Sequence, residues 1–264
     1  MSIPKDASAQ YTKDGFYLAN EPILPGDIVE RATAGMDAVR AGNYDTGTAP
    51  PKSAWNPGDD PDTLCKIELP QLASGDIQQL VSHPELGKWA VAVTGAERVQ
   101  VWWVQLLYKP TSPPDTDKNV QVGWHQDRHY WQAWEEGSEL FTAWVALSDV
   151  AENAGPMRFA RGSHEWGLID EGGFYAQDLQ AQLHNINMPE GAAWEETPAL
   201  LPPGGASFHH CLTFHGSGMN VSGRPRRSLA IHMRTENSRP VDDLRQGLTE
   251  FIDDPVICPT IFGA

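Results

Sequence analysis

From about residue 98 onward the sequence consists of short runs of β-branched and aromatic residues, interrupted by turn-forming residues. Such residues are enriched in strands because their side chains pack well on a pleated surface. The runs that we expect to form strands are 98–108, 139–147, 156–160, 206–214 and 226–234. The turn-rich segments are 110–119, 151–155, 202–205 and 216–225. This pattern favours a closed or double-sheet β architecture.

The residues before this point have a helical pattern. Apolar side chains recur at helical spacing over 25–42, and a second helical stretch covers 74–93 with an interruption near Pro84. The segment 43–64 between them is rich in Pro, Gly and Asp, which is typical of a loop. It is long enough to suggest a lid or a binding segment rather than a simple connector. We therefore expect helices packed on one side of the β architecture.

The 264 residues fit one domain. We divide it into a helical part of about 1–95, a β core of about 96–236 and a C-terminal tail of 237–264. The formal charge is −16, from 19 Lys and Arg against 35 Asp and Glu. Nucleic acids and anionic membranes require a basic face, so this charge argues against both as partners. A small anionic substrate needs only one or two local Arg and remains compatible.

Nothing in the sequence indicates a membrane or an oxidising compartment. The N-terminus lacks the apolar region of a signal peptide, and no run of about 18 apolar residues is present. The three cysteines, Cys65, Cys211 and Cys258, form no CxxC pair and are typical of buried thiols in a reducing compartment. We expect a cytoplasmic protein.

His125-Gln126-Asp127 is the first candidate for chemistry. On a strand, residues i and i+2 point to the same face, so this imidazole and carboxylate converge. A metal needs a third ligand, and His215 is the best candidate, because it follows the apolar run 206–214 and precedes Gly-Ser-Gly. Two His and one carboxylate form the facial triad of non-haem iron(II) oxygenases, which leaves three positions open.

Arg226 lies eleven residues after His215, at the start of the next expected strand. A buried Arg needs an anion, and its planar fork suits a carboxylate. A dicarboxylate cosubstrate would therefore chelate the metal at one end and meet Arg226 at the other. Alternation along this strand places Ser228 and Ala230 on the face of Arg226, so Ser228 is a further candidate for contact with the cosubstrate. It places the apolar side chains on the other face, against the helices: Leu229, Ile231 and Met233.

These residues closely resemble the phytanoyl-CoA dioxygenase family of 2-oxoglutarate-dependent oxygenases. The matching stretches are Trp-His-Gln-Asp-Arg-His-Tyr-Trp at 124–131, Ala-Trp at 143–144, Glu-Asn-Ala-Gly-Pro with Arg-Gly-Ser-His up to 164, and His-Gly-Ser-Gly-Met-Asn at 215–220 with Arg226. Their order and spacing hold over roughly residues 60–235. The resemblance implies a mainly β fold, a double-stranded β-helix (jelly-roll) core with flanking α-helices.

The resemblance also implies cofactors and roles for particular residues. Iron(II) would be held by His125, Asp127 and His215, and 2-oxoglutarate, used together with O2, would be anchored by Arg226. By position in the motifs, the cosubstrate pocket would also include Trp144, Ser217 and Lys66. Relatives that halogenate have a small residue in place of the carboxylate ligand, so the aspartate here implies oxygenation.

Several residues near these motifs are candidates for ligand contact. Tyr130, Trp131 and Trp134 cluster beside the ligands and are equally compatible with core packing or substrate contact, and His129 is a further candidate. Gln105, which shares a strand face with Val101 and Trp103 if the strand is regular, is a candidate for contact with substrate or cosubstrate.

The strand 156–160 leaves one alternative open. Either Arg158 or the pair Met157 and Phe159 faces the pocket, because alternate residues of a strand point to opposite faces. Arg158 and Arg161 together argue against a purely aliphatic substrate.

The remaining histidines of these motifs are expected to have structural roles. His210 has the wrong parity to face the same side as His215, and His209 lies six residues upstream of it. His164 is expected to cap a turn.

The predicted reaction is oxidation, most simply hydroxylation, of an unactivated C–H of a small polar metabolite or natural-product intermediate, with release of succinate and CO2. The strongly acidic chain is a poor match for the phosphates of a CoA ester. Two alternatives remain open. One is a cupin-like metal-dependent isomerase or dioxygenase that does not use 2-oxoglutarate and needs no Arg226. The other is a non-catalytic binding module on the same scaffold.

Overall fold

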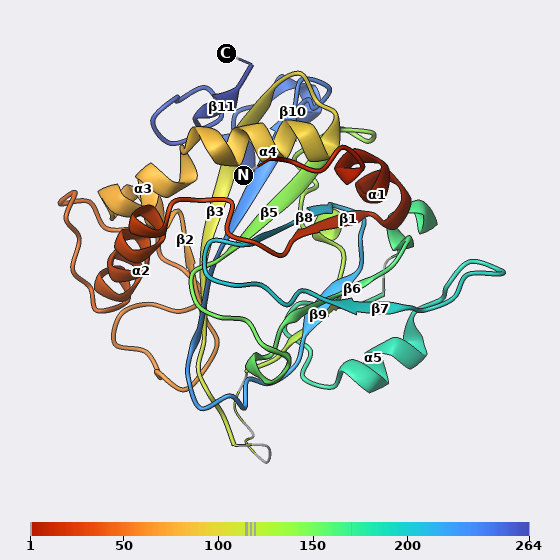
Figure 1. The fold of residues 1–264 in the computed structure, drawn as a ribbon, viewed down its shortest axis with the longest axis horizontal. Helices are drawn as coiled ribbons and strands as arrows, with labels where there is room; N and C mark the ends of the chain where they lie inside the picture. Colours follow the sequence, from red (N-terminus) through yellow and green to blue (C-terminus); the bar gives the residue numbers. More distant parts are fainter. Residues whose placement is uncertain (1, 114–115, 117, 119, 170, 264) are drawn as a thin grey trace.

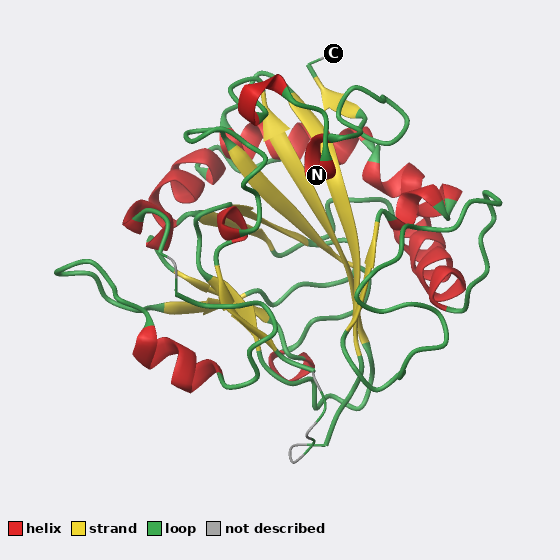
Figure 2. Cartoon of the chain, turned by 180° about the vertical axis from the view of Figure 1, so that it is seen from behind, coloured by secondary structure: helices red, strands yellow, loops and turns green. Residues whose placement is uncertain are grey.

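The computed structural model describes residues 2–113, 116, 118, 120–169 and 171–263. Two antiparallel sheets face one another and form its centre (Figures 1 and 2). The large sheet has the strand order β1 (Phe16–Ala19), β8 (Ala206–His210), β5 (Leu140–Ala146), β10 (Arg226–Thr235), β3 (Val99–Lys109) and β11 (Thr260–Phe262), with β2 (Cys65–Glu68) also paired to β3. The small sheet has the order β4 (Val122–His125), β9 (His215–Ser217), β6 (Met157–Ala160) and β7 (Glu196–Pro198).

Helices cover the outer face of the large sheet. They are α1 (Ala7–Asp14), α2 (Gly26–Arg40), α3 (Gly75–Val81) and α4 (Pro84–Thr94), and α4 crosses in front of β3, β5 and β10 in Figure 1. The short α5 (Leu179–Asn185) lies on the side of the small sheet. The predicted interruption near Pro84 is confirmed, because Pro84 begins α4 and His83 caps it, its Nδ1 accepting from the Glu85 amide at 3.2 Å.

The main apolar core lies between these helices and the large sheet. Leu229, Ile231 and Met233 of β10 pack there with Met36 of α2 and Leu80 of α3, as the alternation predicts. The opposite face of β10 consequently points into the space between the two sheets. A second apolar cluster joins the sheets across this space, through Leu107, Trp144, Met157 and Phe159 among others. The functional site occupies what remains of this interior.

Three expectations about strands require correction. The N-terminal part is not only helical, since β1 and β2 add strands to the large sheet. The strand expected over 206–214 ends at His210, where the chain turns and crosses to the small sheet. In β3 the register against β10 shifts so that Trp103 pairs with His232 and Val101 with Met233. Val101 therefore lies in the outer core instead of sharing the face of Gln105.

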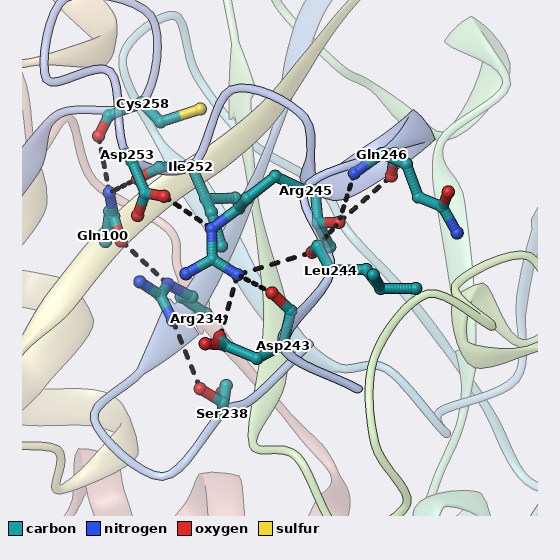
Figure 3. A network of polar contacts seen from close by, with 11 residues as sticks. Gln100, Arg234, Ser238, Asp243, Leu244, Arg245, Gln246, Ile252, Asp253 and Cys258 are labelled. Atoms are coloured by element: carbon teal, nitrogen blue, oxygen red, sulfur yellow. Dashed lines mark hydrogen bonds and ion pairs between the residues drawn. The ribbon is translucent and has the colours of Figure 1, made fainter. Parts of the chain in front are cut away.

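The C-terminal tail is attached to the end of the large sheet by polar contacts (Figure 3). The Gln100 amide donates to the carbonyls of Ile252 and Cys258 at 2.6 and 2.8 Å, and its oxygen accepts from Arg234 Nε at 2.8 Å. Arg245 pairs with Asp253 at 2.5 Å within the tail. Because Gln100 is buried, water cannot bond to these groups, and the protein's own hydrogen bonds satisfy them instead.

Candidate metal centre and cosubstrate pocket

His125, Asp127 and His215 converge at one end of the small sheet. His125 ends β4 and is the register partner of His215, which begins β9. Asp127 lies beyond the strand, at the start of a 3-10 turn (Asp127–His129), so the expected strand alternation does not by itself aim its carboxylate. One possible ligand atom from each residue lies within 4.8 Å of the others. Asp127 Oδ1 is 3.8 Å from His125 Nε2 and 3.7 Å from His215 Nε2.

The hydrogen bonds of the two histidines fix their tautomers. His125 Nδ1 lies 2.8 Å from the Gly123 carbonyl, and His215 Nδ1 lies 3.0 Å from the Thr213 carbonyl. A carbonyl can only accept, so each Nδ1 carries a proton and each Nε2 presents a lone pair. Burial lowers the pKa of both imidazoles, which keeps them neutral. This is the form of histidine that binds a metal.

The carboxylate is held from the side that faces away from these histidines. Thr142 donates to Asp127 Oδ2 at 3.0 Å, and His209 Nε2 lies 3.4 Å from the same oxygen. Burial alone would raise the pKa of Asp127, but the neighbouring His215 and His209 outweigh it and hold the pKa well below its usual range. An ionised carboxylate between two neutral imidazoles suits a divalent cation. Thr142 was not expected at this site, and His209 lies much closer to the ligands than its position in the sequence suggested.

A cavity extends from the triad into the space between the sheets and ends at Arg226. Trp144, Ser217 and Gln105, three of the predicted cosubstrate residues, line this inner cavity. Ser228, a fourth, does not line it, and its hydroxyl donates to the Leu107 carbonyl at 3.3 Å. Lys66, a fifth, lines a second cavity on the other side of the triad.

Arg226 is a buried cation that has no anion beside it among the described residues. Its Nη1 donates to the Gly155 carbonyl at 2.5 Å, while its Nε has no partner in the part of the chain that the structure describes. None of the described carboxylates lies within 4.0 Å of it. Burial lowers the pKa of Arg226 to about 10, which still leaves it charged at neutral pH. The buried Trp144 Nε1 also lacks a partner among the residues described, and the centroid of its ring lies 5.1 Å from the guanidinium carbon. Such a pocket fits an anionic group.

The second, outer cavity shares a wall with the inner one. Both are lined by Gln105, His125, Asp127, Phe174 and His232, and the outer cavity adds Lys66, Tyr130, Trp131 and Tyr175. The positive charge of Lys66 in this cavity is largely balanced, because its Nζ lies 3.3 Å from the Glu68 carboxylate. The segment 43–64, expected as a lid or binding segment, lines neither cavity.

Only some of the predicted substrate residues line a cavity. Tyr130 and Trp131 line the outer cavity, whereas Trp134 is buried against Trp102 and Trp131 and lines neither cavity. His129 is exposed beside Tyr130, with 5.0 Å between ring centroids. Trp134 therefore belongs with core packing, which was one of its two readings.

The alternative that the strand 156–160 left open is resolved in favour of Met157 and Phe159. Arg158 points out of the barrel to Glu152 and Glu196, whereas Met157 lines the inner cavity. Phe159 packs beside His209, with 5.1 Å between ring centroids.

A loop that precedes α5 covers the mouth of the site. Phe174 stands 5.2 Å from the His125 ring, and its amide donates to the Tyr130 hydroxyl at 3.0 Å. The loop is pinned to β4 by two backbone bonds, between Gly123 and Phe174 and between Gly173 and Trp124, each 2.9 Å. A side chain on Gly123 would meet the Gly173 carbonyl at 2.2 Å, so only glycine permits this close approach.

Comparison with known proteins identifies the family of this fold and site. The family model for phytanoyl-CoA dioxygenase (PhyH) matches residues 11–228. The chain belongs to the phytanoyl-CoA dioxygenase family. Proteins similar to it include a probable alpha-ketoglutarate-dependent hypophosphite dioxygenase of Stutzerimonas stutzeri, 25% identical over 88% of this chain and 77% of that protein. An ectoine dioxygenase of Bordetella parapertussis is 26% identical over 90% of this chain and 77% of that protein.

Solved structures of other proteins share the fold. The non-haem alpha-ketoglutarate-dependent carbocyclase SnoK from nogalamycin biosynthesis superposes with a TM-score of 0.70 at 22% identity, covering 93% of this chain and 89% of that one. The epimerase SnoN, in complex with Fe3+, alpha-ketoglutarate and nogalamycin RO, gives 0.67 at 23% identity, covering 94% and 88%. The predicted jelly-roll core is thereby confirmed.

This member of the phytanoyl-CoA dioxygenase family is an iron- and 2-oxoglutarate-dependent oxygenase, and its His-Asp-His triad fits the iron site. Its cofactors are therefore iron and 2-oxoglutarate, as the sequence predicts. In the described part of the chain no helix is long and apolar enough to cross a membrane.

Proposed function

We propose that the enzyme binds iron(II) through His125, Asp127 and His215, anchors the distal carboxylate of 2-oxoglutarate on Arg226, and hydroxylates a C–H of a small polar molecule in the outer cavity. The observation that carries this proposal is the buried, unpaired Arg226 at the far end of a cavity that begins at the triad. A guanidinium in such a place needs an anion, and a 2-oxo acid with a second carboxylate spans a metal and a cation.

The two cavities divide the work between cosubstrate and substrate. When bound, iron(II), 2-oxoglutarate and O2 supply the oxidising power, and succinate and CO2 are released. The chain supplies neutral imidazoles and an ionised carboxylate, and Thr142 and His209 hold that carboxylate in place. Phe174 and Tyr130 close over the site and limit access of water, which protects a reactive centre. Because the carboxylate ligand is present, we propose oxygenation rather than halogenation.

The outer cavity offers its substrate a hydrogen-bond acceptor. Thr142 has one proton, which it gives to Asp127, so it must accept from His232 Nδ1 at 2.8 Å. The second nitrogen of His232, Nε2, then presents a lone pair, and it has no partner in the described structure. Burial lowers the pKa of His232 to about 4, so the ring stays neutral. A substrate with a hydroxyl or N–H donor and an apolar face suits this acceptor and the aromatic walls.

The proposal is tested by adding iron(II) and then 2-oxoglutarate without oxygen. A visible charge-transfer band should form only when 2-oxoglutarate chelates the iron, so a cupin-like enzyme that does not use 2-oxoglutarate, or a metal-free binding module, would give none. Arg226→Ala should need much more 2-oxoglutarate for the same band. Release of succinate in a screen of small hydroxylated and amine metabolites, followed by mass spectrometry of the product, then identifies the substrate. Absence of the band in the wild type at millimolar 2-oxoglutarate would refute the proposal.

A further inference from the structure

Lys109 and Arg226 are buried cations on directly opposite positions of β3 and β10. Lys109 is 0% exposed and Arg226 is 2% exposed. Like charges at such cross-strand positions repel one another, and burial removes the water that would screen them. The chain therefore carries a cost at this point that packing alone does not explain, since a methionine would fill the space of Lys109 without a charge.

Within the part of the chain that the structure describes, the Lys109 ammonium donates to neutral acceptors. Its Nζ donates to Ser217 Oγ at 2.6 Å, to the Ser217 carbonyl at 3.1 Å and to the Gly218 carbonyl at 2.5 Å. Within the described residues no carboxylate lies within 4.0 Å of it. Burial, and after it the charge of Arg226, lowers the pKa of Lys109 well below its usual range. Among the described residues, the two cations thus share one buried region that has no resident negative charge.

The contact with Ser217 has a directional consequence. In its ammonium form Lys109 has three donors and no lone pair, one donor for each of its three contacts. Ser217 Oγ then accepts from Lys109, and its own proton is left for another partner. Ser217 lines the inner cavity together with Arg226 and Trp144, whereas Lys109 lies behind it and lines neither cavity. The hydroxyl is therefore available as a donor to an acceptor inside the cavity, next to the unpaired guanidinium.

We propose that Lys109 is a positioning residue that makes this pocket selective for a 2-oxo acid with a distal carboxylate. It fixes the Ser217 hydroxyl as a donor to that carboxylate and adds a second positive charge behind it, opposite Arg226. The inference rests on the proposed function of the inner cavity and extends it to a residue that does not touch the cosubstrate. The ligand carboxylate would in turn supply the negative charge that the two cations lack.

The test compares two ligands that differ in what they contact. Oxalate chelates the metal but has no distal carboxylate, whereas 2-oxoglutarate has both ends. Binding of each is measured by calorimetry on iron(II)-loaded protein without oxygen. Lys109→Met removes the charge at similar length, and Lys109→Gln keeps an N–H donor for Ser217 if the methionine variant folds poorly. Lys88→Met is the matched control, because Lys88 is exposed and its ion pair with Glu85, at 2.6 Å, lies on the surface.

We expect Lys109→Met and Lys109→Gln to bind 2-oxoglutarate about 10- to 100-fold more weakly, the range for a charge-assisted contact. Oxalate binding should change by less than about threefold, since the metal centre is intact. Lys88→Met should match the wild type for both ligands. Wild-type affinity for 2-oxoglutarate in the Lys109 variants, or equal weakening of both ligands, would overturn the inference. A wild type that binds oxalate but not 2-oxoglutarate would instead overturn the proposed function.

Discussion

His209 and His215 face each other across the interior of the barrel, with ring centroids 4.5 Å apart. They are six residues apart in sequence and belong to different sheets, because the chain leaves β8 after His210 and enters β9 at His215. Strand alternation therefore cannot predict whether their side chains point to the same side, because they do not share a strand. The crossing brings His209 Nε2 to 3.4 Å from Asp127 Oδ2. His209 thus lies against the carboxylate, although the sequence pattern placed it far from the site.

The first prediction concerns this support. His209→Phe and Thr142→Val should each lower the affinity for iron(II) about 10-fold, because partners of a ligand typically contribute 10- to 100-fold. The apo protein should unfold at nearly the wild-type temperature. Arg158→Leu is the control, since Arg158 faces outward to Glu152 and Glu196 and should leave iron binding and kinetics unchanged. Iron affinity equal to wild type in both variants would show that Asp127 needs neither partner.

Much of the site could be predicted because its motifs are local. His125 and Asp127 are two residues apart in the sequence. The spacing between His215 and Arg226 is set by the single turn that joins β9 to β10. The outward packing of Leu229, Ile231 and Met233 follows from strand alternation, so the inward face of Arg226 follows as well. These features require no knowledge of which strands pair.

The rest depended on how distant strands pair. Lys109 gains its meaning from its register with Arg226, and Thr142 from its position beside His232 across β5 and β10. The register shift near Trp102 reverses alternation within β3, which separates Val101 from the face of Gln105. No single segment contains this information. In the sequence, the signal for Lys109 was a charged residue at the end of an otherwise apolar strand.

The second prediction concerns the triad. His215→Ala, and likewise His125→Ala or Asp127→Ala, should abolish turnover and reduce iron(II) binding steeply while the apo fold remains, because packing between the helices and the large sheet provides the main core. Circular dichroism and an iron titration measure the two effects separately. Removing the metal from the wild type with a chelator should reproduce the loss of turnover, and iron(II) should restore it. Normal iron binding by His215→Ala would exclude it as a ligand.

The third prediction concerns the anchor. Arg226→Ala should cost about 2–5 kcal/mol in binding of 2-oxoglutarate, the range for truncating one partner of a buried charged pair. The requirement for the primary substrate should change much less. Arg226→Lys should rescue only partly, since an ammonium cannot form the two parallel bonds of a guanidinium. A KM for 2-oxoglutarate that is unchanged in Arg226→Ala would move the anchor elsewhere, with Lys66 as the next residue to test.

The fourth prediction concerns stability of the C-terminal tail. Gln100→Leu removes two bonds to the carbonyls of Ile252 and Cys258 and one from Arg234. Leaving buried carbonyls unpaired should lower the free energy of unfolding by about 2–4 kcal/mol. Urea unfolding measures this loss, and limited proteolysis should show cleavage in 244–258 before the rest. Gln78→Leu is the control, because its bond to the Val256 carbonyl is exposed. Equal effects of both changes would contradict a special role for Gln100.

The last prediction concerns the response of stability to acid. His210 accepts a hydrogen bond from the Leu212 amide through Nδ1 at 3.1 Å, and burial, with His164 and His209 nearby, lowers its pKa to about 4. In the unfolded chain the pKa is about 6.5, so between these values the unfolded state binds more protons and stability falls as the pH falls. From pH 7.5 to 4.5 this single group should remove about 2 kcal/mol.

Carboxylates and other histidines also titrate in this range, so the wild type must be compared with a variant that lacks only this proton site. In His210→Asn the amide oxygen can accept from the Leu212 amide as Nδ1 does, without taking up a proton. Urea unfolding of both proteins at pH 7.5, 6.0, 5.0 and 4.5 should show that the variant loses about 2 kcal/mol less over the series. Parallel curves for the two proteins would mean that His210 titrates in the folded state as it does in the unfolded chain.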